Sequence, residues 1–507
     1  MSQTNHKIGE MVSELRNLRG LTQSEFAKKL NTSQSAVNRI EKGGQNLSLE
    51  MLGRISEVLQ KPLVALGDQG VNLRIDGGHE LKGEITLKTS KNAAVGLLMA
   101  SLLNKGTTVF KTFPRIEEVF RIIEVLESIG VKIKWLPGSG LELKRPAKLD
   151  MDNLDVKAAR RTRSVIMMMG PLVHEFKDFK IPHAGGCKLG ERTVKPHLYG
   201  LEEFGIDIAT KQNFYQITSN LKRPERIVLY ESGDTVTENV VMAAASGKGT
   251  TIIQMASANY MVQDVCYFLR ELGVGIQGIG TTTLTITGVG RDIKKNVEYA
   301  PVEDPIEAMF FVSTAIATNS EITIKKVPID FMVLELAKLK KMGAKFTETK
   351  RYKADNGFTD LIDLIVHKHN GKLISAQGKL YSRPYPGLNM DNLPYFVPIA
   401  AVAKGRTLIH DWSYENRAIY YTEMSKVGVN TDLADRHRLY ITGPTKFTNA
   451  DIISPPALRP ASLLLIGMLA APGVSTLRNV YTINRGYEDI SRRLNSLGAK
   501  IEVLHSI

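Results

Sequence analysis

One cysteine lies in a segment that would make its thiol reactive. Cys187 follows Gly185 and Gly186 and precedes Lys188 in GGCKLGER, which ends with Arg192. Neighbouring cations lower the pKa of a thiol and favour the nucleophilic thiolate, and the glycines would let the loop close over a substrate and exclude water. A free cysteine is more often a small buried apolar residue. The segment therefore predicts a reactive loop thiol, with a core cysteine as the alternative.

Most of the positive charge belongs to the chain beyond residue 70. The 507 residues are enough for two or three domains and carry a net charge of +14. Residues 1–70 contain nine Lys and Arg and seven Asp and Glu, a net of +2, so +12 lies in the other 437 residues. This excess indicates either a solvated basic surface or a cleft for phosphorylated substrates.

The sequence also indicates a compartment. Its two cysteines, Cys187 and Cys266, cannot form a disulfide framework, which favours a reducing environment. The N-terminal segment has no apolar stretch of signal-peptide type, and the longest apolar runs, such as 463–471, are too short to span a bilayer. We therefore expect a cytoplasmic protein without membrane attachment. No cluster of metal-ligating side chains occurs in the sequence, so we expect neither a metal nor another cofactor.

The N-terminal segment predicts four short helices. Apolar residues recur at helical spacing between residues 8 and 18. Further helices are predicted over 23–30, over 34–42 and from residue 49 to about residue 60. Ser33, at the end of the turn Asn-Thr-Ser, is the expected N-cap of the third helix.

The stretch LRGLTQSEFAKKLNTSQSAVNRIEKG resembles the Cro/repressor-type helix-turn-helix family. We expect such a domain over 1–67, followed by a linker over 68–71. In that family the second helix of the motif enters the major groove, and the near-neutral charge leaves a packing module that never touches DNA as the alternative. By resemblance, the residues that would face bases are Gln34, Ser35 and Asn38, and those that would approach phosphates or bases are Gln23 and Arg39.

A sixfold repeat begins at about residue 72. Each unit contains a strongly apolar helix, a strand and a second helix that ends at a glycine before another strand. The glycines, spaced 75, 68, 70, 85 and 70 residues apart, are Gly130, Gly205, Gly273, Gly343, Gly428 and Gly498. Glycine is the usual left-handed residue after a helix C-terminus, and helices apolar on all sides are buried. The repeat therefore predicts helices surrounded by sheets, with two ordinary α/β domains as the alternative.

Four motifs accompany the repeat in order: SKNAA at 90–94, GGCKLGER at 185–192, ENR at 415–417 and NRGYE at 484–488. Together they resemble the UDP-N-acetylglucosamine 1-carboxyvinyltransferase family over 72–507. The first two motifs favour that family over the sister family that makes 5-enolpyruvylshikimate 3-phosphate.

The resemblance implies an α/β fold, a two-domain inside-out α/β barrel built from six repeated units, besides the small all-α helix-turn-helix domain. One lobe would comprise 91–302. The other would combine 72–90 with 303–507, and the active site would lie between the two lobes.

The resemblance also implies a reaction. The enolpyruvyl group of phosphoenolpyruvate would pass to the 3-hydroxyl of UDP-N-acetylglucosamine with release of phosphate, a step of peptidoglycan precursor synthesis. Cys187 matches the loop cysteine that acts as an acid and binds phosphoenolpyruvate covalently. The residues that match cations holding the phosphate and carboxylate of the donor are Lys91, Arg192, Arg459 and Arg485. Arginine suits the planar carboxylate, and lysine can follow charge that develops on phosphate.

Further matches concern the acceptor. Asp391 in YPGLNMD matches a carboxylate near the acceptor hydroxyl and would receive its proton; the alternative is an N-cap of the helix that follows. Asn92 and Arg163 match residues that contact the UDP-sugar, and Arg417 matches one that helps to close the lobes. His197 is also matched, although a histidine there can be structural.

The sequence departs from the family at several positions. Ala457 stands two residues before Arg459, where the family has an aspartate implicated in proton transfer, and Lys195 stands where an aspartate recognises uracil. Thr235 lies in a stretch, 233–237, that replaces the family's Ser-Val-Gly-Ala-Thr, and Pro305 replaces an arginine. Two alternatives follow: a transferase that acts on another nucleotide or sugar, or a regulator that uses a degenerate transferase domain as a metabolite sensor.

Overall fold

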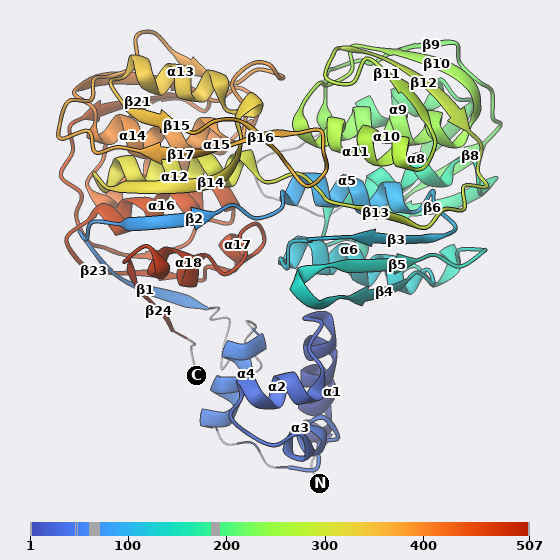
Figure 1. Ribbon diagram of the computed structural model, residues 1–507, viewed down its shortest axis with the longest axis horizontal. Coiled ribbons are helices and arrows are strands. Elements are labelled where there is room, and N and C mark those ends of the chain that lie inside the picture. The colour runs from blue at the N-terminus through green and yellow to red at the C-terminus, as the bar shows by residue number, and fades with distance from the viewer. Residues whose placement is uncertain (1–2, 46, 48, 60–70, 184–192, 505–507) are drawn as a thin grey trace.

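The computed structural model describes residues 3–45, 47, 49–59, 71–183 and 193–504. Figure 1 shows two large lobes side by side and a small helical domain below them, near the N-terminus. No helix within the described ranges is long and apolar enough to cross a membrane.

The small domain contains the four predicted helices: α1 (Gln3–Leu18), α2 (Gln23–Lys29), α3 (Gln34–Glu41) and α4 (Leu49–Leu59). Ser33 caps α3, as predicted, by accepting a hydrogen bond from the backbone N–H of Ala36. Thr22 and Glu25 form a reciprocal capping box at the start of α2. An apolar cluster separate from that of the lobes, centred on Phe26 and Val37, holds the helices together.

Six sheets occur among the described residues, three in each lobe. The sheets of one lobe have the strand orders β13 (Val297–Tyr299), β3 (Thr107–Phe110), β5 (Leu141–Lys144), β4 (Lys132–Trp135); β6 (Asp178–Pro182), β8 (Phe214–Ser219), β7 (Ile206–Thr210); and β11 (Gly275–Gln277), β12 (Thr283–Val289), β10 (Lys248–Gln254), β9 (Arg226–Val228).

The second lobe combines the first two strands of the transferase region with strands from the C-terminal part. Its sheets have the orders β15 (Phe346–Glu348), β17 (Asp360–Val366), β14 (Glu321–Pro328), β2 (Lys82–Thr86), with β16 (Tyr352–Lys353) also on β17; β18 (Leu380–Tyr381), β19 (Gly405–His410), β21 (Arg438–Gly443), β20 (Asn430–Asp435); and β22 (Asp451–Ile453), β23 (Gly473–Arg478), β1 (Asn72–Gly77), β24 (Lys500–Leu504).

Five of these sheets share one topology: a single edge strand joins in parallel and the other strands pair antiparallel. This recurrence is the structural form of the sequence repeat. The six repeat glycines all have positive φ, for example +97° at Gly130 and +89° at Gly428, which is the left-handed conformation predicted for them.

The apolar helices lie inside the sheets, as the repeat predicts (Figure 1). In α12 every side chain is buried. The interior helices are α5 (Lys91–Ser101), α8 (Met169–Leu172), α10 (Asp234–Ser246), α12 (Pro305–Ala317), α14 (Phe396–Val402) and α16 (Leu458–Ala470). The remaining α-helices are α6 (Glu117–Ser128), α7 (Val156–Ala159), α9 (Lys195–Glu202), α11 (Tyr260–Glu271), α13 (Val333–Lys341), α15 (Arg417–Tyr421), α17 (Tyr481–Asn484) and α18 (Ile490–Ser496).

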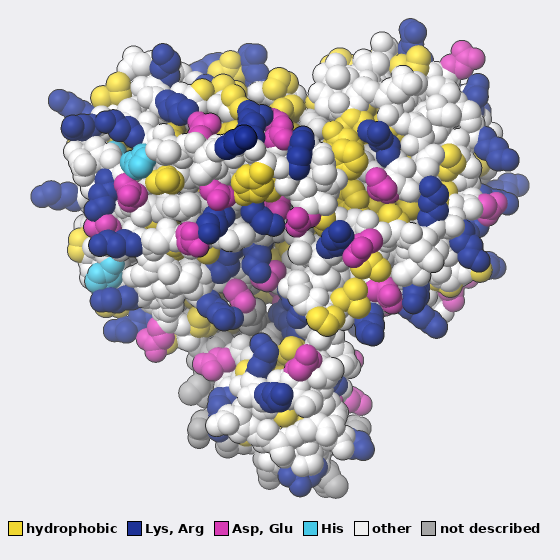
Figure 2. All heavy atoms as spheres, viewed as in Figure 1, with side chains coloured by type: hydrophobic (Ala, Val, Ile, Leu, Met, Phe, Trp, Pro, Cys, Tyr) yellow, Lys and Arg dark blue, Asp and Glu magenta, His cyan; other side chains and the backbone are white. Residues whose placement is uncertain are grey.

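Figure 2 shows Lys and Arg side chains spread over the outer faces of both lobes, with Asp and Glu among them. A solvated surface therefore accounts for part of the positive charge. The Lys and Arg side chains that could bind an anionic substrate are those that lie between the two lobes.

Candidate active site

The N-terminus of α5 brings a lysine to the place where the lobes meet. Lys91 is the first residue of this helix, which Ser90 caps through a 3.4 Å hydrogen bond from the N–H of Ala93. Burial lowers the pKa of Lys91, Glu118 and Asp391 raise it, and Arg459 and Arg485 lower it, with a net lowering. These charges come from both lobes, so the SKNAA motif lies within electrostatic range of the C-terminal arginines.

The arginine of the NRGYE motif is paired across the lobes. Arg485, which follows α17, donates from Nη2 to Glu118 Oε2 at 2.6 Å. The other oxygen of Glu118 accepts from Thr162 Oγ1 at 2.6 Å. Burial raises the pKa of Glu118, but Lys91 and Arg485 outweigh it and the pKa is lowered overall. An ionised carboxylate therefore lies among the cations that a doubly anionic substrate would need.

Asp391 lies between two arginines. Its Oδ1 accepts from Arg417 Nη1 at 3.2 Å and from the hydroxyl of Tyr414 at 3.4 Å, and its Oδ2 accepts from Arg459 Nη2 at 3.3 Å. The N-cap residue of the short 3₁₀ helix η5 (Leu393–Tyr395) is Asn392, and no side chain caps this helix. The alternative of a helix N-cap is therefore wrong for Asp391, whose carboxylate is directed into the charged site.

Arg417 is held in place by buried partners within the second lobe. It is 1% exposed and donates to Asp411 from Nε at 2.5 Å and from Nη2 at 2.9 Å, and Asp411 is itself 0% exposed. Nη2 also donates to the carbonyl of Met390 at 2.6 Å, and the guanidinium carbon lies 3.8 Å from the ring centroid of Tyr414. Arg417 thus fixes the position of the segment that carries Asp391.

Arg459 is buried beside two tyrosines. Its Nη1 donates to the hydroxyl of Tyr487 at 2.9 Å and to that of Tyr395 at 3.4 Å. Burial lowers the pKa of Arg459, but these tyrosines and nearby carboxylates raise it well above its usual value, so the charge persists. Ala457 is the N-cap residue of α16 and makes no side-chain cap hydrogen bond, and its methyl group is buried.

Two residues outside the four sequence motifs also belong to this region. Asp304 caps α12 by accepting from the N–H of Ile306 at 2.8 Å, and burial raises its pKa to about 6 against the effect of Arg459. Tyr260 of α11 accepts at its hydroxyl from Asn92 Nδ2 and from Ser90 Oγ, both at 3.3 Å. Tyrosine and helix-capping aspartate are common core residues, so only their position marks them.

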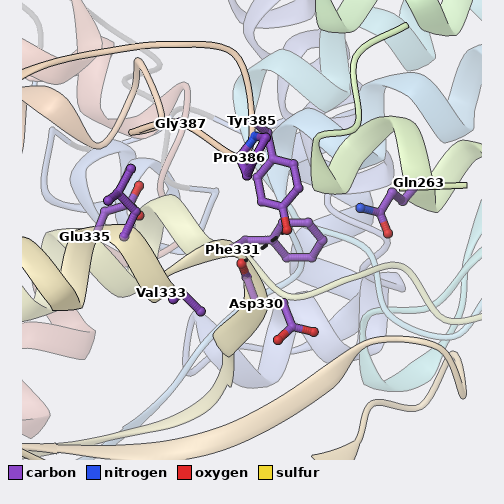
Figure 3. Close-up of a pocket in the computed structure, with 9 residues that line it drawn as sticks. Gln263, Asp330, Phe331, Val333, Glu335, Tyr385, Pro386 and Gly387 are labelled. Atoms are coloured by element: carbon purple, nitrogen blue, oxygen red, sulfur yellow. Dashed lines mark hydrogen bonds between the residues drawn. The ribbon is translucent and has the colours of Figure 1, made fainter. Parts of the chain in front are cut away.

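A cavity of about 370 Å³ opens beside Tyr260 and spans the two lobes. Figure 3 shows Gln263 of α11 on one side and Phe331 and Tyr385 on the other, with the Tyr385 hydroxyl donating to the carbonyl of Asp330. The Phe331 ring packs edge-to-face on Tyr260, with centroids 5.6 Å apart. Phe331 thus links the wall of the cavity to Tyr260, the hydrogen-bond partner of Asn92.

Arg163 belongs to the first lobe and is electrostatically close to His197. It begins the 3₁₀ helix η3 (Arg163–Met168) and donates to the carbonyl of Thr193 at 3.3 Å. His197 is buried, and this burial and Arg163 lower its pKa to about 3. The two ring nitrogens of His197 lie 3.2 Å from Asn239 Nδ2 and from Thr235 Oγ1. His197 is thus a buried, hydrogen-bonded side chain whose lowered pKa favours the neutral imidazole, as expected of a structural histidine.

Two predicted site residues, Cys187 and Arg192, lie outside the described residues. Lys195 is the first residue of α9 and is exposed.

In the small domain, both polar atoms of the Gln23 side chain form hydrogen bonds within the domain. Its Nε2 donates to Glu41 at 2.8 Å and its Oε1 accepts from Gln34 at 3.2 Å. Ser35 and Arg39 are exposed and Asn38 is half-buried on α3.

Comparisons with known proteins agree with this fold. The family EPSP synthase (3-phosphoshikimate 1-carboxyvinyltransferase) matches residues 75–494, and a helix-turn-helix family matches residues 12–66. A UDP-N-acetylglucosamine 1-carboxyvinyltransferase of Campylobacter jejuni subsp. jejuni serotype O:23/36 is 31% identical over 429 residues, which cover 85% of this chain and 98% of that protein. One of the same name from Treponema denticola is 31% identical over 430 residues, with the same coverage.

Solved structures share the fold. The enolpyruvyl transferase NikO from Streptomyces tendae has a TM-score of 0.73 and 22% identity, covering 86% of this chain and 99% of that one. An EPSP synthase from Acinetobacter baumannii has a TM-score of 0.65 and 19% identity, covering 86% and 100%. The chain belongs to the EPSP synthase family of enolpyruvyl transferases and carries a helix-turn-helix domain at its N-terminus. The predicted family and fold class are confirmed.

Proposed function

We propose that this enzyme transfers the enolpyruvyl group of phosphoenolpyruvate to the 3-hydroxyl of UDP-N-acetylglucosamine and releases phosphate, in peptidoglycan precursor synthesis in the cytoplasm. The observation that carries the proposal is the convergence of Lys91, Arg459 and Arg485 with Asp391 between the lobes. The names and coverage of the relatives support the choice of donor and acceptor.

The cations account for donor binding. Phosphoenolpyruvate carries a carboxylate and a phosphate, which need several positive charges in a cleft with little water. Arg459 and Arg485 are now paired with Asp391 and Glu118. The donor would take over these guanidinium groups, and Lys91 would follow the charge that develops on the phosphate oxygens. Arg192 would add a further cation.

The chemical step would be an addition followed by an elimination. Asp391 would accept the proton of the acceptor hydroxyl as its oxygen attacks C2 of phosphoenolpyruvate, while an acid, for which we propose Cys187, protonates C3. Loss of a proton from C3 would then restore the double bond as the C2–O bond to phosphate breaks. The sum is one enolpyruvyl ether and one phosphate, with no redox change.

The acceptor site sets the substrate. Asn92 and Arg163 would contact the UDP-sugar, with Arg163 at the diphosphate, and Arg417 would help to close the two lobes around it. Lys195 and Thr235 replace family residues at the nucleotide, which favours a different nucleotide or sugar as the second candidate acceptor.

A phosphate-release assay tests both acceptors. Purified protein with phosphoenolpyruvate and UDP-N-acetylglucosamine should release phosphate, and Cys187→Ser should abolish the release. Release only with another member of a nucleotide-sugar panel would identify the alternative acceptor. No release with any acceptor, combined with tight binding of a UDP-sugar, would favour a metabolite sensor, for which Ala457 and the fused domain are the supporting observations.

We also propose that residues 1–67 bind DNA through α3. This helix lies at the end of the small domain away from the lobes (Figure 1). Gln34, Ser35 and Asn38 would contact base edges, and Gln23 and Arg39 would contact phosphates or bases. Selection of bound sequences from a random pool should return a preferred site, and Gln34→Ala with Asn38→Ala should remove that preference. Affinity unchanged by both substitutions would contradict recognition of bases by α3.

A further inference from the structure

The helix-turn-helix domain contacts the first lobe at the start of α6. Arg19, directly after α1, donates from Nη2 to Glu117 Oε1 at 3.0 Å and from Nε to the carbonyl of Leu59 at 2.9 Å. Its guanidinium carbon lies 4.2 Å from the ring centroid of Phe120. The Arg19 and Glu117 side chains are only 12% and 8% exposed. This ion pair is therefore largely withdrawn from water, and removing either partner would leave a poorly solvated charge.

A second contact fixes the orientation of the domain. Gly20 has φ +65°, and a Cβ atom built on it would lie 2.3 Å from Cβ of Trp135 in β4. Arg115 donates to the carbonyl of Arg19 and lies 4.8 Å from the Trp135 ring centroid. The turn after α1 thus lies in direct contact with the lobe, at a distance that only glycine permits.

The same short segment of the lobe reaches the active site. Glu117 faces the small domain, and the next residue, Glu118, holds Arg485 at 2.6 Å. The backbone N–H of Arg115 donates at 2.9 Å to Glu488, three residues after Arg485. Neighbouring side chains on an α-helix diverge by about 100°. One rigid helix end can therefore contact the small domain on one side and the donor-binding arginine on the other.

We propose that docking of the helix-turn-helix domain on Glu117 and binding of the anionic donor at Arg485 oppose each other through the start of α6. This inference rests on the proposed donor site. Docking keeps α6 in the position where the Glu118 carboxylate pairs with Arg485. Glu118 therefore competes with the donor for this guanidinium group. The donor displaces Glu118, the start of α6 shifts, and the contact between Arg19 and Glu117 weakens.

The coupling must act in both directions. A ligand that weakens docking is itself bound more tightly when docking is lost, by the same factor. Phosphoenolpyruvate would then release the DNA-binding domain from the lobe, and loss of the Arg19 contact would raise the affinity for phosphoenolpyruvate. The alternative is a passive tether, in which the two contacts share a helix but do not influence each other.

The test measures phosphoenolpyruvate binding to the full-length protein by titration calorimetry. Arg19→Ala and the nearly isosteric Glu117→Gln, which alters the other side of the contact, should each tighten binding about fivefold, the lower end of typical allosteric couplings. Lys29→Ala removes an exposed charge from the end of α2 in the same domain and should leave the affinity within about twofold.

A double-mutant cycle identifies the route. Glu118→Gln removes the competitor and should tighten binding by itself, and in that background Arg19→Ala should add nothing. Hydrogen exchange in α1 and α4 should rise when phosphoenolpyruvate binds the wild type, but not when it binds Glu118→Gln. Equal affinity of wild type, Arg19→Ala and Glu117→Gln would overturn the coupling and leave the donor site intact. Absence of phosphoenolpyruvate binding in every variant would overturn the donor site as well.

Discussion

Replacement of Arg417 by alanine should destabilise the second lobe strongly. Arg417 is 1% exposed, and its partner Asp411 is fully buried. The pair has two hydrogen bonds, at 2.5 and 2.9 Å, and the only other side-chain donor described for Asp411 is the hydroxyl of Tyr421. Arg417→Ala would leave the Asp411 carboxylate buried with that hydroxyl alone. Breaking a buried ion pair on one side typically costs about 3–5 kcal/mol.

The expected shift in melting temperature follows from this cost. A domain of about 200 residues loses about 2–4 °C per kcal/mol, so Arg417→Ala should lower the melting of the second lobe by roughly 6–20 °C. Scanning calorimetry, which resolves separate transitions of a multidomain protein, is the appropriate assay. Phosphate release should also fall, because Arg417 donates to Asp391 and to the carbonyl of Met390.

A paired variant distinguishes the charge effect from simple loss of packing. Arg417→Leu combined with Asp411→Leu removes both charges and keeps apolar volume, so at least half of the lost stability should return. The reasoning is refuted if Arg417→Ala melts within about 2 °C of the wild type, or if the double variant is less stable than the single one.

Three further predictions concern catalysis, the pH dependence of stability and the contact between the small domain and the first lobe. Asp391→Asn should lower kcat by about 10²–10⁴-fold, whereas Asp355→Asn, an exposed carboxylate of the same lobe, should leave the rate unchanged. Because the pKa of His197 falls from 6.5 to about 3 on folding, only the unfolded chain takes up this proton between those pH values, so stability is lost as pH falls below 6.5. At about 1.4 kcal/mol per pH unit, the free energy of unfolding should fall between pH 6.5 and pH 5 by roughly 2 kcal/mol more in the wild type than in His197→Gln. Denaturant unfolding measures this difference, and parallel pH curves for the two proteins would contradict a neutral histidine. Gly20→Ala should displace the small domain and speed hydrogen exchange in α1, while Gly53→Ala, where the added methyl meets no atom within 4 Å, should stabilise α4 by about 0.5–1 kcal/mol.

Local chemistry made much of the fold predictable from the sequence. The four helices of residues 1–67 follow from apolar spacing and from the cap at Ser33. The sixfold repeat follows from the glycines after each helix, such as Gly130, because a left-handed residue and the strand after it are local features. The same locality explains why the motifs predicted Lys91 and Arg485 as site residues, since each motif is a short continuous segment.

The tertiary structure decided which charges face each other. Glu118 precedes Arg485 by 367 residues, and nothing in the helix start Glu117-Glu118 distinguishes it from an ordinary acidic first turn. Asp391 could equally have capped a helix by sequence, and only the approach of Arg417 and Arg459 directs it into the site. The ion pair between Arg19 and Glu117 likewise could not be predicted from either segment alone. Caps and periodicity act within a few residues of the chain, whereas electrostatic partners depend on distances in space, which only the folded arrangement of both lobes determines.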